Sequence, residues 1–283
     1  MTEPNQSFPP DIRTDEPTIA RVYDYGMGGK DNFSVDREAA LALVKVTPEI
    51  LDVGRENRLF LYRAVRYLAE EVGIRQFIDM GSGMPTELNV HQVAQRFQPE
   101  ARVVYVDIDP IVLAHGRAIL ADNPSTTVIT ADMVNSSQIL ADPDLRALID
   151  FSEPVGALYF SVLHCLPDEA DPKAVLGSML DALPSGSHIA LSHLISEDVA
   201  AGDALTAALL AQGPWGRVRR PEELRDFVAG LEPVAPGIVD VSAWRPDPDQ
   251  PPLTPVPEPL RPYLGQSSGN KKVWEMGGVL RKP

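Results

Sequence analysis

The sequence predicts an α/β protein built on one seven-stranded, mainly parallel sheet with helices on both faces. Short runs of β-branched and aliphatic residues alternate with amphipathic segments of about ten residues, and this alternation is typical of parallel βαβ units. The last two predicted strands have no helix between them, which indicates a terminal antiparallel hairpin. A helical segment precedes the first strand and is expected to form an N-terminal lid.

The predicted elements follow one another along the chain. A helix over residues 55–72 carries Leu61, Val65 and Leu68 at helical spacing and ends at Gly73. Further helices are expected over residues 89–97, 111–120, 173–183, 200–210 and 221–229. Strands are expected over residues 76–80, 102–106, 127–130, 157–160, 188–191, 238–241 and 273–280.

Proline divides the chain into segments. Four of the first 17 residues are proline, so residues 1–17 are expected to form a flexible arm. Residues 18–72 are expected to form the helical lid, and residues 73–283 the core domain. Eight prolines fall within residues 246–262. Because neither a central strand nor a helix tolerates that density, we expect an extended insertion there.

The composition excludes several classes of function. Lys and Arg number 25 against 40 Asp and Glu, a net charge of −15, and aromatic residues make up 6%. Nucleic acid binding needs basic surfaces and often aromatic platforms, so we expect no nucleic acid partner. No apolar run approaches the ~18–20 residues of a membrane helix. The polar N-terminus and the single cysteine, Cys165, predict a cytoplasmic protein without a disulfide or a metal site.

A glycine turn follows the first predicted strand. Gly81, Ser82 and Gly83 form a bend that allows the backbone to approach a ligand closely. A dinucleotide site would require a third glycine, but the chain has Thr86 there. The carboxylate of Asp79 would repel a pyrophosphate and attract an ammonium or sulfonium group. A tight turn without a ligand would explain the same residues.

Two more carboxylates follow the next two strands. Asp107 lies 24 residues beyond Gly83, an offset typical of an acid that binds the ribose of a nucleoside. It could instead cap the following helix. Asp132 could accept a hydrogen bond from an exocyclic amine such as that of adenine. Three acids at consecutive strand ends point to a ligand site more strongly than any one of them.

This order of acids resembles the class I S-adenosylmethionine-dependent methyltransferases, which have a Rossmann-like fold. The resemblance implies S-adenosyl-L-methionine as cofactor and a substrate loop that begins after the fourth strand. It implies these cofactor-binding residues: Asp79, Gly81, Ser82 and Gly83 at the turn, Asp107 and Ile108 at the ribose, Asp132 and Met133 at the adenine, and Ser161 at the start of the substrate loop.

Upstream segments narrow the resemblance. Residues 20–33, 36–38, 55–58, 63–66 and 163–164 are similar to an actinobacterial S-adenosyl methyltransferase family formerly catalogued as a domain of unknown function. One departure is the Gly-Met pair at residues 26–27, where two larger apolar residues are expected. The likeness spans nearly the whole chain and implies no particular methyl acceptor.

Five further residues are candidates for a role at the site. Of Arg58 and Arg63 on the helix before the first strand, one is expected to bind the carboxylate of the cofactor's methionine moiety, and Arg63 is favoured because it lies beside the apolar stripe. Both could instead be solvated or form surface ion pairs. His164 is a candidate base, because its reference pKa of ~6.5 suits proton transfer near neutral pH, although it could be structural. Tyr25 is a second catalytic candidate within a lid segment that could instead pack on the core. Cys165 is expected to be a buried, unreactive thiol.

The sequence therefore predicts methyl transfer from S-adenosylmethionine to a small molecule. It leaves open whether nitrogen, oxygen or carbon is methylated, and the oligomeric state. Two alternatives remain. A regulatory protein could bind the same cofactor without transfer, and an NAD-dependent oxidoreductase could share the fold, although Asp79 and the missing third glycine disfavour it.

Overall fold

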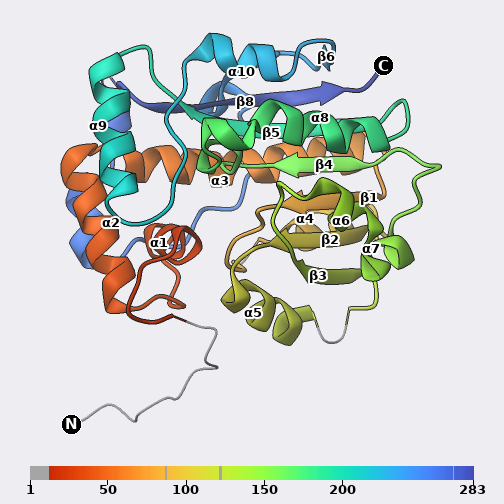
Figure 1. The fold of residues 1–283 in the computed structure, drawn as a ribbon, viewed down its shortest axis with the longest axis horizontal. Helices are drawn as coiled ribbons and strands as arrows, with labels where there is room; N and C mark the ends of the chain where they lie inside the picture. The colour runs from red at the N-terminus through yellow and green to blue at the C-terminus, as the bar shows by residue number, and fades with distance from the viewer. Residues whose placement is uncertain (1–12, 87, 121–122, 270) are drawn as a thin grey trace.

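The computed structural model describes residues 13–86, 88–120, 123–269 and 271–283, and within them one mixed sheet forms the centre of the molecule (Figure 1). Its order is β3-β2-β1-β4-β5-β8-β6, with β7 paired separately to β8. The strands are β1 (Gln76–Met80), β2 (Arg102–Asp107), β3 (Thr126–Thr130), β4 (Gly156–Tyr159), β5 (His188–Ile195), β6 (Glu232–Pro233), β7 (Val239–Asp240) and β8 (Trp274–Arg281).

Helices precede the sheet, connect its strands and cover both faces. They are α1 (Ile19–Gly26), α2 (Ser34–Val46), α3 (Ile50–Tyr67), α4 (Val90–Phe97), α5 (Pro110–Leu120), α6 (Ser136–Ala141), α7 (Pro143–Leu148), α8 (Pro172–Ala182), α9 (Val199–Leu210) and α10 (Pro221–Phe227). A π-helical turn over Leu68–Val72 extends α3 to Gly73, whose φ of 81° ends the helix as predicted.

The strand order reverses between β1 and β4. Strands β1 to β5 are parallel, and β1 lies between β2 and β4. Strand β8 runs antiparallel to β5, from the pair His188 and Arg281 to the pair Ile195 and Trp274. Crevices at such reversals, beyond the carboxyl ends of the strands, bind ligands in α/β proteins.

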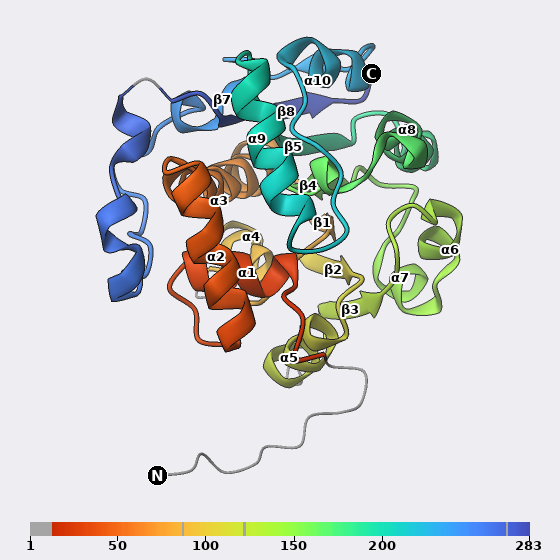
Figure 2. The ribbon, with the colours of Figure 1, turned by 60° about the vertical axis from the view of Figure 1, so that its left-hand side comes forward.

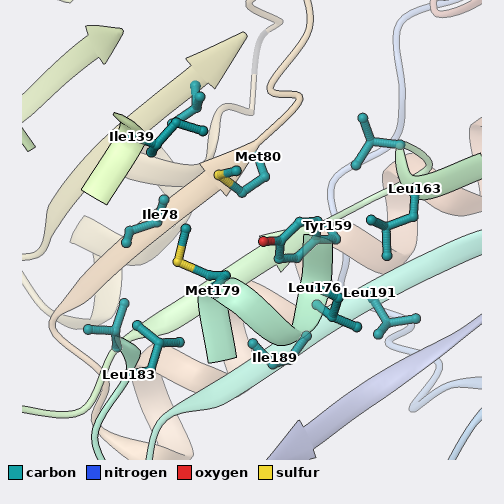
Figure 3. Close-up of a cluster of buried hydrophobic side chains, with 14 of the residues drawn as sticks. Ile78, Met80, Ile139, Tyr159, Leu163, Leu176, Met179, Leu183, Ile189 and Leu191 are labelled. Atoms are coloured by element: carbon teal, nitrogen blue, oxygen red, sulfur yellow. The ribbon is translucent and has the colours of Figure 1, made fainter. Parts of the chain in front are cut away.

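Alternation along the strands builds a separate core on each face. Phe77 and Leu158 pack with Phe60 of α3 on one face. Ile78 and Tyr159 face the opposite side, where α6, α7, α8 and α10 cover the sheet. Figure 3 shows this second core, in which all ten labelled side chains are fully or almost fully buried. The two cores hold the strand ends, and the residues after them, in fixed positions.

The N-terminal helices lie beyond the carboxyl ends of the strands. Figure 1 shows α1, α2 and α9 on the left, the side toward which β4 points, and α2 packs against α9. Arg21 and Asp36 join α1 to α2 through a buried ion pair of 3.0 Å. The predicted helical character of residues 18–72 is confirmed, whereas their role as a lid stays a prediction.

Most predicted elements are confirmed, with differences in their number and in their bounds. The sheet of the described residues has eight strands rather than seven, because the two-residue β6 was not predicted. The short helices α6 and α7 were also missed, and β5 extends beyond its predicted end at Leu191 to Ile195. The terminal antiparallel pairing is confirmed, since β7 pairs with β8.

The proline-rich insertion has no strand among residues 246–262, and a 3₁₀ helix over Glu258–Tyr263 ends it. It runs along α2 and α3, in blue at the left of Figure 2. Residues 1–12 of the predicted arm lie outside the described residues. No helix in the described part of the chain has both the length and the apolar character to cross a membrane.

Candidate functional site

The glycine turn after β1 is built for close backbone approach. Gly81 and Gly83 have φ values of 70° and 64°, a region that side chains disfavour. A Cβ at Gly81 would lie 2.2 Å from Cγ2 of Val162, so only glycine fits there. The Gly83 amide donates to Oδ2 of Asp107 over 2.8 Å. Asp107 at the end of β2 therefore fixes the glycine turn that follows β1.

Asp79 lies at the end of β1, where it is only 5% exposed. Burial raises its pKa to about 7; the charge of Arg58 opposes this rise and that of Asp107 adds to it. Arg58 extends from α3 and donates to Oγ1 of Thr86 and the carbonyl of Leu88. A buried carboxyl group and a guanidinium group are thus held at the point where the strand order reverses.

Arg58 and Asp79 line one cavity together with the glycine turn. Its other lining residues are Ser82, Gly83, Pro85, Asn89, Val90, His91, Tyr105, Val112, Gly116 and Val128. Ser82 Oγ is buried and has no hydrogen-bond partner among the described residues. A negative group, a positive group and a free hydroxyl suit a zwitterion such as the ammonium and carboxylate of an amino acid.

The other predicted cofactor residues surround the ends of β2 and β3. Asp107 also accepts from the Asp109 amide over 2.9 Å, and burial raises its pKa against these hydrogen bonds. Ile108 is 65% exposed, an apolar side chain on which a flat ligand could pack. Met133 reaches the turn, with its Cε 3.4 Å from the position of a Cβ on Gly81. Asp132 accepts from the Val134 amide over 3.0 Å.

Arg63 and Tyr25 lie away from this cavity. Arg63 donates to the carbonyls of Trp244 and Val241 over 2.8 and 2.6 Å, and so it anchors the segment before the insertion. The structure places Arg58, not Arg63, beside Asp79. Tyr25 is 6% exposed and packs in an apolar cluster on Leu51 and its neighbours, which matches the alternative that a lid tyrosine packs on the core.

His164 is buried in an aromatic cluster. Its Nδ1 accepts from the Leu194 amide over 3.0 Å, and its ring lies 5.2 Å from His193 and 5.1 Å from Trp215. Burial lowers its pKa well below the ordinary value, and the charges of His193 and Arg219 lower it further. The geometry favours the structural interpretation of His164. Cys165 is half-buried rather than buried, and desolvation raises its pKa, which keeps that thiol protonated.

A second buried polar cluster was not predicted from the sequence. Ser161 Oγ donates to Oε1 of Glu275 over 2.6 Å, and the Ser161 amide donates to Ser192 Oγ over 2.8 Å. Ser192 Oγ donates to Oδ1 of Asn57 over 2.6 Å. The available signal was a glutamate within the otherwise apolar strand 273–280. No group of three or more potential metal ligands occurs in the part of the chain that the structure describes.

A mostly parallel sheet with a glycine turn after β1, and with acids at or just beyond the carboxyl ends of β1, β2 and β3, defines a class I S-adenosylmethionine-dependent methyltransferase. The chain belongs to the S-adenosyl methyltransferase family, whose model matches residues 5–283. S-adenosylmethionine is therefore its methyl donor, as predicted. The comparisons give no support to an NAD-dependent oxidoreductase or to a protein that binds the donor without transfer.

Similar proteins of known structure include two actinobacterial chains. One is a chain from Thermobifida fusca that is assigned to the methyltransferases. It is 42% identical to this chain with a TM-score of 0.84, and the match covers 95% of this chain and 97% of the Thermobifida fusca chain. A DUF574 family protein from Streptomyces avermitilis is 37% identical with a TM-score of 0.86, covering 95% and 99%. A 3-hydroxy-5-methyl-1-naphthoate 3-O-methyltransferase from Streptomyces sahachiroi is 30% identical over 169 residues. That match covers 58% of this chain and 45% of the relative.

Proposed function

We propose that this protein methylates a small-molecule acceptor and that the cavity of Arg58 and Asp79 binds the methionine end of the donor. This proposal rests on the pair of opposite charges, the buried Asp79 and the half-buried Arg58, beside the turn of Gly81 and Gly83. The Asp79 carboxylate would bind the donor's ammonium group, Arg58 its carboxylate, and Ser82 Oγ would gain the hydrogen bond it lacks.

Asp107 and Asp132 would bind the nucleoside end. Asp107 ends β2 and Asp132 follows β3, and these two strands extend from β1 in that order. Asp107 already accepts two backbone hydrogen bonds, and its carboxylate oxygens retain lone pairs for the ribose hydroxyls. Ile108 and Met133 would supply apolar contacts. S-adenosylmethionine, when bound, supplies a methyl group on a positively charged sulfur.

The acceptor side would be closed by the N-terminal helices. Because α1 and α2 lie beyond the carboxyl edge of the sheet, they would exclude water from the reacting atoms, as would the insertion packed along α2 and α3. The net charge of −15 favours a small acceptor over a nucleic acid. The aromatic acceptor named for the Streptomyces sahachiroi relative supports testing hydroxynaphthoates first.

Calorimetry and a turnover screen test this function. We expect S-adenosylhomocysteine to bind the full chain, NAD to show no measurable binding, and Asp107→Ala to weaken S-adenosylhomocysteine at least tenfold. Release of S-adenosylhomocysteine from S-adenosylmethionine is then measured by mass spectrometry with 3-hydroxy-5-methyl-1-naphthoate and related acceptors. Tighter binding of NAD than of S-adenosylhomocysteine would refute the assignment of this cavity.

A further inference from the structure

Glu275 is a buried acid that donor binding does not use. It lies within β8, is 1% exposed, and stands between the half-buried Trp274 and the buried Met276. Its Oε1 accepts from Ser161 Oγ over 2.6 Å, whereas Oε2 is buried with no hydrogen-bond partner among the described residues. A buried acceptor without a partner destabilises the folded state. Such an oxygen points to a hydrogen-bond donor that a ligand would bring.

Glu275 lies on the half of the sheet edge that the donor residues leave free. The acids at the carboxyl ends of β1, β2 and β3 occupy one side of the strand reversal. Glu275 pairs across the sheet with Leu194, near the carboxyl end of β5, on the other side of that reversal. A ligand that contacts Glu275 would therefore lie beside the donor rather than within the donor's own site.

Val162 connects the donor half of the sheet edge to the half that holds Glu275. Its Cγ2 packs against Gly81 in the donor turn, so closely that a Cβ there would lie 2.2 Å from it. The neighbouring Ser161 donates to Glu275. The Glu275 charge also raises the pKa of Tyr23, a group on which Arg58 acts with the opposite sign. Contact and charge thus both connect Glu275 to the donor cavity.

A hydrogen-bond network fixes the orientation of the Glu275 carboxyl group. Ser161 adopts a φ of 54°, which side chains disfavour, and its amide donates to Ser192. Ser192 donates to Asn57, whose amide donates to the Tyr23 hydroxyl over 3.3 Å, and Tyr23 donates to the Gly54 carbonyl. This network ties the sheet edge to α1 and α3 and leaves Oε2 as the oxygen without a protein partner.

We propose that Glu275 is the general base of methyl transfer and that the acceptor group is a hydroxyl, whose hydrogen bonds to Oε2. This inference rests on the proposed function and names its acceptor class. A neutral amine already carries a free electron pair, whereas a hydroxyl oxygen becomes a good nucleophile only as its proton leaves. A buried carboxylate with one unpaired oxygen therefore suits O-methylation.

The step balances in atoms and charge. The hydroxyl proton moves to Oε2, and an electron pair of the acceptor oxygen forms the bond to the methyl carbon. The carbon–sulfur bond breaks and its electron pair stays on sulfur, so the sulfonium becomes a neutral thioether. Glu275 ends as a neutral acid, and one positive and one negative charge disappear together. Loss of both charges is favourable in a buried site.

The titratable and polar groups that act on Glu275 support this role. Burial raises its pKa to about 8, the hydroxyls of Ser161 and Ser192 oppose the rise, and the charge of Asp240 on β7 adds to it. The charge of Glu275 also raises the pKa of Tyr23 on α1 and that of Cys165. A carboxyl group in this range is a much stronger base than an ordinary glutamate and is well matched to a phenol.

Sinefungin tests the placement of Glu275 without an acceptor. In this donor analogue a carbon bearing an amino group replaces the methylated sulfur, so its ammonium occupies the methyl position. We compare the Kd of sinefungin with that of S-adenosylhomocysteine, by calorimetry at pH 6 and 9, in the wild type and in Glu275→Gln. Asp79 would contact the amino acid end that both ligands share, so its titration should change both Kd values by the same factor. The ratio of the two Kd values is therefore independent of the Asp79 titration.

We expect the ratio of the Kd of S-adenosylhomocysteine to the Kd of sinefungin to be at least tenfold higher in the wild type than in Glu275→Gln. In the wild type this ratio should be higher at pH 9 than at pH 6. Asp240→Asn, which removes a neighbouring acid, should keep the wild-type preference. An equal ratio in wild type and Glu275→Gln would overturn the proposal. So would loss of S-adenosylhomocysteine binding by Glu275→Gln, because Glu275 would then support the donor site or the fold. Failure of the wild type to bind either ligand would instead refute the proposed function.

Discussion

Arg58 of α3 and Asp79 of β1 line the same cavity, although Arg58 donates its hydrogen bonds to Thr86 and to the Leu88 carbonyl. The guanidinium is therefore held by the segment that leads into α4, and its charge still lowers the pKa of Asp79. Two opposite charges that are positioned independently can each bind one end of a zwitterion. This arrangement explains why the site tolerates an acid whose pKa burial raises to about 7.

Replacement of Asp79 by asparagine should stabilise the donor-free protein and weaken donor binding. The pKa of Asp79 rises from 3.8 to about 7 on folding, so its contribution to stability is fully present below pH 3.8 and is lost as pH rises to about 7. Asparagine carries no such penalty. Since one unit of pKa shift corresponds to about 1.4 kcal/mol, and the pKa of about 7 already includes the attraction of Arg58, we expect a gain of up to about 4 kcal/mol at pH 8.

Urea unfolding of wild type and Asp79→Asn at pH 4.5, 6 and 8 measures this effect. The difference in unfolding free energy should grow with pH and become constant above about pH 7. Calorimetry with S-adenosylhomocysteine should show at least tenfold weaker binding to the variant. A pH-independent difference in stability would show that Asp79 does not titrate in this range.

Replacement of Gly81 by alanine should disrupt the turn, whereas the same change at Gly83 should act through backbone strain alone. A Cβ at Gly81 meets Val162 at 2.2 Å, but a Cβ at Gly83 meets nothing within 4 Å. Both residues have positive φ, so each variant loses about 1–2 kcal/mol from strain. Only Gly81→Ala should also displace Val162 and lower affinity for S-adenosylhomocysteine. Equal affinities in the two variants would contradict this.

Much of the fold could be predicted because its signals are local. The strand over residues 76–80 matches β1 in full, and Gly73 ends the preceding helix as expected. The missed elements have weak local signals. Strand β6 consists of Glu232 and Pro233 alone, and it pairs with β8 through the pairs Glu232–Arg281 and Pro233–Leu280. A strand of two residues forms only because β8 pairs with it. The periodicity of residues along the chain does not reveal that pairing.

The candidate site also contains residues that local patterns identify and residues that such patterns miss. The acids after the first three strands were identified from their spacing, since parallel strands bring their carboxyl ends to one edge. Arg58 and Arg63 lie on one helix, and their sequence positions do not show which of them faces that edge. Glu275 was missed because its partner Ser161 is 114 residues away in the chain. Contacts at that separation depend on sheet topology, which residue patterns predict only in outline.

Variants of the two arginines should separate donor binding from anchoring of the insertion. Arg58→Ala removes the charge beside Asp79, and we expect S-adenosylhomocysteine to bind 10- to 100-fold more weakly. Arg63→Ala removes hydrogen bonds to Trp244 and Val241, and it should lower the unfolding free energy by about 2–3 kcal/mol while affinity stays within threefold. Calorimetry and urea unfolding of both variants provide the measurements. The reverse pattern would restore Arg63 as the carboxylate-binding residue.

His164 and His193 should remain neutral across the physiological range. Burial lowers the pKa of His193 to about 3 and that of His164 well below its ordinary 6.5. Because both side chains gain protons near pH 6.5 only when the chain unfolds, the stability they contribute is present above that value and is lost as pH falls below it. Two-dimensional NMR of histidine-labelled protein should show no titration of either ring between pH 5 and 8. Titration of His164 near pH 6.5 would revive its candidacy as a base.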